Sequence, residues 1–149
     1  MSTEKNKWID AVGKLLQLTQ DGDLEWKPRD PPAYLNVQPD RKRVDVAYEA
    51  RYKDRRLRLY ELMYKVEKPR ESVTSAFTHP ALASAIGSAF NQPEYPYWTK
   101  RTVLELLDQS GFGAWTFPTT EVLDDLLTAV RYQAAGVKQF LDEILAAAS

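Results

Sequence analysis

The residues that could carry chemistry in this chain are few. His79 is the sole histidine of the 149 residues, and no cysteine is present. Thiol nucleophiles, thiolate metal sites and disulfides are therefore excluded. Ser75 and Ser84 lie near His79, but a catalytic triad is defined by geometry and their spacing does not indicate one. We interpret His79 as a residue near the start of a helix.

Three acids in the N-terminal third partly match a calcium-binding loop. Asp21, Asp23 and Glu25 occupy its first, third and fifth positions. Trp26 stands where that loop needs glycine, and Pro32 where it needs a bidentate acid. The match is incomplete at the two positions that define the loop, so we expect no metal site.

Glycine-rich phosphate-binding motifs are also incomplete. Gly111-Phe112-Gly113 lacks the third glycine and the strand–helix context of a dinucleotide fingerprint, which favours a hairpin turn. No stretch of the form GxxxxGK[ST] occurs. We therefore expect no cofactor and no enzymatic activity.

A β-hairpin is the clearest element of the sequence. Residues 44–66 alternate apolar or small side chains with charged ones, a period of two that is typical of half-buried strands. A short charged turn separates the two strands. The expected register places Tyr52 opposite Leu57 and Arg51 opposite Arg58.

Glu61 has an unusual place in this hairpin. The alternation puts it on the same face as Leu57 and Leu59, beside Tyr48. A buried carboxylate needs a partner, which would be Tyr48 or a basic side chain. The alternative is a bulge that turns Glu61 outward.

The opposite face of the hairpin carries Tyr60, Leu62 and Tyr64. These side chains are too apolar for a fully hydrated surface. We expect either that the chain partly covers them near the open end of the hairpin, or that they contact a partner protein.

The remaining elements follow from local patterns. Residues 4–19 show the apolar spacing of a helix, and Gly22 is placed to cap it in a left-handed conformation. A strand is expected around Trp26 and a helix after Pro80. Residues 99–108 suit a strand or a short helix, and we favour a strand because 114–117 is strand-like.

Together these elements predict a single α+β domain over residues 1–149. An antiparallel sheet of about five strands is flanked by an N-terminal helix and a long C-terminal helix packed on it, in the order α-β-β-β-α-β-β-α. That order resembles the fold of secretion chaperones. The resemblance implies a small acidic dimer that holds an unfolded segment of a partner.

The C-terminal helix is expected to run from Thr120 to about Ala147. Its length would be about 40 Å, whereas five strands span only about 20–25 Å. It therefore bends near Gly136, packs on the first helix, or extends its last turns onto another chain. In that last case, Phe140, Leu141 and Ile144 would form a homodimer or partner interface.

Charge is distributed unevenly although the net charge is only −1. Residues 41–70 hold eleven Lys/Arg and five Asp/Glu, and residues 102–149 hold two and seven. The basic side chains at the hairpin turn are candidates for nucleic-acid contacts: Arg51, Lys53, Arg55, Arg56 and Arg58. The slightly acidic chain as a whole argues against that role.

These observations favour a non-catalytic protein-interaction module, such as an adaptor, a small chaperone-like protein or an inhibitor. The alternative is a nucleic-acid-associated accessory protein that uses the basic hairpin 41–70. We expect a cytoplasmic protein with no membrane association, because the chain has no cysteine, no apolar export signal and no apolar run of about 20 residues.

Overall fold

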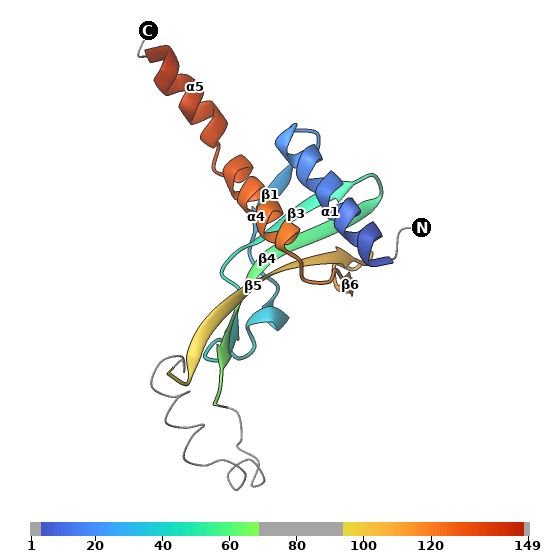
Figure 1. The fold of residues 1–149 in the computed structure, drawn as a ribbon, viewed down its shortest axis with the longest axis vertical. Helices are drawn as coiled ribbons and strands as arrows, with labels where there is room; N and C mark the ends of the chain where they lie inside the picture. Colours follow the sequence, from blue (N-terminus) through green and yellow to red (C-terminus); the bar gives the residue numbers. More distant parts are fainter. Residues whose placement is uncertain (1–3, 69–93, 148–149) are drawn as a thin grey trace, which may run out of the picture.

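The computed structural model describes residues 4–68 and 94–147. It confirms an α+β fold, in which two helices cover one face of an antiparallel sheet (Figure 1). The helices are α1 (Glu4–Gln20), α4 (Glu121–Ala134) and α5 (Val137–Ala147), with a 3₁₀ turn η1 (Ala33–Asn36). The strands are β1 (Trp26–Arg29), β2 (Lys42–Arg43), β3 (Ala47–Tyr52), β4 (Arg55–Val66), β5 (Tyr97–Leu107) and β6 (Gly113–Thr116).

The strand order is β1-β3-β4-β5-β6, and β2 pairs separately with β4. The strand expected over 99–108 is confirmed as β5, and β6 follows it across a loop. The helix expected after Pro80, together with His79, lies outside the described residues.

The hairpin register differs from the expectation by two residues. Tyr52 pairs with Arg55 and Ala50 with Leu57, because the turn consists of Lys53 and Asp54 alone, with Lys53 at φ 55°. A shift of two residues keeps the side chains of the paired strands on their expected faces. The observed register also places Glu49 opposite Arg58, which is favourable, while Arg51 lies opposite Arg56, again a pair of like charges. Val44, expected on the face of Tyr48, precedes β3 and packs with Tyr60 and Leu62 on the opposite face instead.

The main core lies between the sheet and the two helices α1 and α4. α4 contributes Leu123, Leu126 and Val130, all fully buried, and the sheet contributes Leu59 and Leu104. Apolar residues three and four apart on α4 form the stripe that packs on the sheet.

The predicted single C-terminal helix is interrupted. α4 ends at Ala134, Gly136 adopts a left-handed conformation at φ 66°, and α5 starts at Val137. Of the alternatives left open by the sequence, the bend near Gly136 is therefore confirmed. α5 continues past the end of α4 and away from the sheet (Figure 1).

Candidate functional site

α5 is the element that most clearly exposes apolar surface. It contains no buried residue. Phe140 is 59% exposed, Leu141 44%, Ile144 47% and Leu145 68%. An isolated helix of fewer than about 12–15 residues is marginal in water, and α5 has 11. Packing of this apolar face is therefore what would stabilise it.

The three hairpin residues expected at a partner surface are placed differently. Tyr60 and Leu62 are 4% and 5% exposed, and they form a second core cluster with Val44, Ala47 and Val103. Tyr64 packs on this cluster and is half-buried. The chain itself therefore covers these side chains. Of the two alternatives expected from the sequence, this is coverage within the chain and not contact with a partner protein.

The segment that covers this second cluster is held by an asparagine. The side chain of Asn36 donates to the Val44 carbonyl at 3.0 Å and accepts from the Val44 amide at 2.9 Å. Leu35 of η1 packs on the cluster. The proline-rich connector therefore folds back over the outer sheet face, a long-range contact that periodicity does not encode.

A buried polar network occupies the same face beside this cluster. Arg58 is 4% exposed, and its guanidinium donates to the Tyr34 hydroxyl and the Gly111 carbonyl, both at 3.0 Å. It also lies 3.6 Å from the carboxylates of Glu49 and Glu105. Arg58 is therefore not a surface residue for nucleic acid.

Glu105 connects this network to the second core cluster. Tyr60 donates its hydroxyl hydrogen to Glu105 Oε1 at 2.6 Å. Burial and this hydrogen bond raise the pKa of Tyr60 far above its usual range. The Tyr60 phenol therefore keeps its proton at neutral pH and is a weak acid. The network stabilises the contacts between the strands and the loops that supply its members.

Sequence reasoning did not single out Tyr34 or Glu105. The available signal was that Glu105 shares a strand face with Val103 and Leu107, both apolar. An acid at such a position requires a buried cation. Its partner Arg58 comes from β4 and could be assigned only with the register known.

Glu61 lies on the helix-covered face, as the alternation predicted. Its carboxylate lies 3.5 Å from Arg131 of α4 and 3.7 Å from Lys100 of β5. The pairing of β4 with β5 is continuous through Glu61, so no bulge turns it outward. The expected basic partner is thus confirmed.

The basic hairpin turn is only partly accessible. Arg56 pairs with Glu49 at 3.1 Å, whereas Arg51, Lys53 and Arg55 are exposed. Within the described residues these three form no ion pair, although the Lys53 ammonium lies 5.5 Å from the Tyr52 ring. The candidate nucleic-acid contacts are thereby reduced to three side chains.

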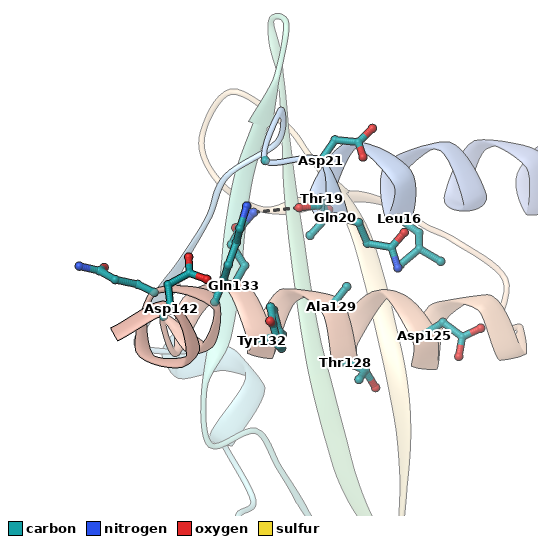
Figure 2. A pocket seen from close by; sticks show the side chains of 14 residues that line it. Leu16, Thr19, Gln20, Asp21, Asp125, Thr128, Ala129, Tyr132, Gln133 and Asp142 are labelled. Carbon is teal, nitrogen blue, oxygen red and sulfur yellow. Dashed lines mark hydrogen bonds between the residues drawn. The ribbon is translucent and has the colours of Figure 1, made fainter. Parts of the chain in front are cut away.

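A groove of about 1080 Å³ runs between α1 and α4 and is bordered by α5 (Figure 2). Gln133 lines the groove, and its side-chain amide donates to the carbonyls of Thr19 and Leu24 at 3.3 and 2.8 Å. Its side-chain oxygen accepts from the Trp26 amide at 2.7 Å. The groove is lined largely by polar side chains whose charged members are Asp21, Asp125, Lys138 and Asp142.

No group of three or more metal-ligating side chains occurs among the described residues. Within the same residues, no helix has the length and apolar character to cross a membrane. Among the described residues, exposed surfaces include the apolar face of α5, the groove beside it and the hairpin turn. No protein-family model matches the chain, and neither a curated protein nor a solved structure matches it.

Proposed function

We propose that this chain is a protein-interaction module, of the adaptor, small chaperone-like or inhibitor kind, and that α5 is its docking element. The observation that carries the proposal is the exposed apolar face of a helix that buries none of its own residues. Full burial of a Leu, Ile or Phe side chain contributes about 1.5–3 kcal/mol. Four such side chains on one face are enough to anchor a partner.

The placement of α5 supports docking rather than packing within the chain. α4 buries its stripe against α1 and the sheet, but α5 begins where these supports end and runs away from them (Figure 1). Contiguous apolar surface of this kind marks protein contact sites on folded proteins.

The proposal is tested by affinity capture from a native lysate, with nuclease present. The wild-type chain is compared with the double variant Phe140→Gln, Ile144→Gln, because glutamine keeps the helix propensity of α5. Proteins retained by the wild type should be lost with the double variant. Circular dichroism and urea unfolding check that the fold is intact.

Val37→Gln is the matched control. Val37 is apolar and 74% exposed but lies far from α5 in the sequence, just after η1. It should retain the same proteins as the wild type. An identical set of captured proteins with all three chains would contradict a docking role for α5.

Nucleic-acid binding is a second candidate, supported by the side chains of Arg51, Lys53 and Arg55, which are exposed and form no ion pair with the residues that the structure describes. Phosphate contacts by such residues give affinity that falls steeply with salt. Arg51→Glu with Arg55→Glu should abolish salt-dependent retention on single-stranded DNA or RNA. Lys27→Glu with Arg29→Glu makes the same charge change on exposed β1 and should leave it intact.

A further inference from the structure

We propose that the far end of strands β4 and β5 binds single-stranded nucleic acid. One base stacks on Trp98, and Arg43, Lys65 and Lys100 contact the phosphates. These four residues form what we call the distal patch. It is separate from α5 and lies at the opposite end of β4 from the hairpin turn, so it adds a site to the proposed function.

Two contacts mark how far α4 reaches along the sheet. Arg131 lies 3.5 Å from the Glu61 carboxylate, and Asp124 accepts from the Thr102 hydroxyl at 2.6 Å. β4 and β5 continue past this row and away from the helices (Figure 1). Every second residue after Glu61, beginning with Met63, therefore lies on the helix-covered face but beyond α4.

The register gathers the distal patch on this face. Arg43 of β2 and Lys100 of β5 both lie opposite Met63 of β4, and Trp98 lies opposite Lys65. Directly paired residues share a face, and so do residues two apart along a strand. Because neighbouring strands are about 4.8 Å apart and residues rise about 3.3 Å along each, the backbones of Lys65 and Lys100 lie about 5–7 Å from that of Trp98.

Trp98 supplies the aromatic surface of the distal patch. It is 46% exposed, and the Arg43 guanidinium carbon lies 5.7 Å from its ring centre. Single-strand binders combine exposed aromatic side chains, on which bases stack, with cations that follow the phosphate backbone. Stacking of this kind needs a base whose face is free, so the arrangement favours a single strand over a duplex.

The strand segments around Trp98 are basic. Residues 42–43, 63–66 and 97–101 carry five cations and no acid: Lys42, Arg43, Lys65, Lys100 and Arg101. Lys100 lies 3.7 Å from Glu61, and Arg43 lies 3.6 Å from Asp45. Both cations are at least half-exposed, and exposed pairs of this kind are weak. Lys65 forms no ion pair with the residues that the structure describes, so the distal patch stays positive and complements a polyanion.

Three phosphate contacts set the expected salt dependence. For single strands, the logarithm of the affinity falls with the logarithm of the salt concentration by about 0.7 per phosphate contacted. The slope should therefore be about −2. The affinity should fall by about 20-fold between roughly 50 and 200 mM salt.

Fluorescence anisotropy of labelled oligo(dT) and oligo(U) measures binding to the full-length chain. The two oligonucleotides distinguish DNA from RNA, and binding of either one with the expected salt slope supports the site. A duplex of the same length tests the need for a free base, and polyglutamate tests recognition of charge alone. Binding of neither oligonucleotide would overturn the site, as would equally tight binding of the duplex or of polyglutamate.

Variants of the distal patch separate stacking from charge. Trp98→Leu should lower the affinity by about 5- to 150-fold, the effect of one stacked base, and should leave the salt slope at about −2. Lys65→Gln with Lys100→Gln should reduce the slope to about −0.7, because two of the three phosphate contacts are lost. An unchanged affinity in the first variant, or an unchanged slope in the second, would overturn the assignment.

Each variant has a matched control. Trp115→Leu removes another tryptophan, which is 41% exposed on β6. Lys27→Gln with Arg29→Gln removes two charges from exposed positions of β1. Both controls should bind oligonucleotide as tightly as the wild type, with the fold checked by circular dichroism and urea unfolding. Losses equal to those of the patch variants would overturn the site.

The same assay separates this inference from the proposed function. Phe140→Gln with Ile144→Gln should keep oligonucleotide binding, so the docking role of α5 stands or fails independently. Arg55 and Lys65 are ten residues apart on β4, about 33 Å, which is several Debye lengths. The turn variant Arg51→Glu with Arg55→Glu should therefore also keep binding at the distal patch. Loss of binding in the turn variant alone would assign the nucleic acid to the turn and overturn this inference.

Discussion

Arg58 joins three separate parts of the chain through its guanidinium. Tyr34 comes from η1, Gly111 from the loop between β5 and β6, and Glu105 from β5. A buried cation must be neutralised and hydrogen-bonded, and removal of one partner is much more costly than removal of the whole pair. The network therefore ties the connector and the loop to the outer sheet face.

Glu105→Gln should lower the free energy of unfolding by about 3 kcal/mol, because it leaves Arg58 buried with reduced neutralisation. Urea denaturation measures the change. Glu49→Gln should cost less, since the Glu49 side chain is 20% exposed and that of Glu105 10%. The double variant Arg58→Met, Glu105→Leu should recover most of the unfolding free energy that Glu105→Gln loses. A double variant as unstable as Glu105→Gln would contradict the role of Glu105 in neutralising Arg58.

Tyr60 makes stability dependent on pH in the alkaline range. Its pKa is raised in the folded chain by burial and by the hydrogen bond to Glu105. The unfolded chain releases this proton above about pH 10, whereas the folded chain keeps it. The contribution of Tyr60 to stability is therefore fully present below about pH 10 and is lost as the pH rises further.

Tyr60→Phe removes this proton, so the unfolding free energy should fall less steeply above about pH 10 than in the wild type. Urea denaturation between pH 8 and 11, a chosen range, measures both slopes. The variant should also be less stable at neutral pH, because Glu105 Oε1 loses its hydrogen bond at a cost of about 1–3 kcal/mol. Equal slopes would argue against the assigned pKa shift.

At the scale of elements, the end of α1 shows how local chemistry sets a boundary. Gly22 has φ 81°, and the following amides of Asp23 and Leu24 donate to the Leu18 carbonyl at 2.9 and 3.1 Å. The predicted left-handed cap is therefore confirmed. The turn returns the chain to the sheet at Trp26, whose indole donates to Thr19 at 2.9 Å.

Gly22→Ala should destabilise the protein by about 1 kcal/mol, because an L side chain is strained at this φ. Gly13→Ala, inside α1, is the matched control. Nothing lies within 4 Å of an added Cβ at either position, so the backbone conformation is the difference between them. Gly13→Ala should stabilise the protein by up to about 1 kcal/mol, measured by thermal or urea unfolding. A change in unfolding free energy of the same sign in both variants would contradict the left-handed cap at Gly22.

At the scale of the whole molecule, folding and the proposed docking use different parts of the chain. The two core clusters draw on α1, α4, the sheet and the connector, whereas α5 contributes no buried residue. A chain that ends at Gly136 should therefore fold. Its unfolding free energy should lie within about 0.5 kcal/mol of the wild-type value.

Urea denaturation of the two chains under the same conditions measures this difference. The shortened chain should no longer capture the proteins whose retention depends on α5. A large loss of stability in the shortened chain would show that α5 belongs to the core, contrary to its exposure.

The strands and their faces could be predicted from sequence alone. The alternation in 44–66 assigned Leu57 and Leu59 to one face and Tyr60 and Leu62 to the other, and both assignments are confirmed. The register was wrong by two residues, because it depends on the backbone of Lys53 at the turn. The alternation of side chains cannot distinguish two registers that differ by two residues, since the expected and the observed register bury the same faces.

The distinction between apolar surface and apolar core was decided by tertiary structure. Tyr60 and Phe140 are both aromatic residues in well-patterned elements, yet one is 4% exposed and the other 59%. The residues that cover Tyr60 come from the connector through Leu35 and Val44, and α5 extends past the supports that bury α4. The sequence determined which residues are apolar and how they alternate, because those patterns are local. Which of them are covered depended on contacts between distant segments, and those exist only once the chain is folded.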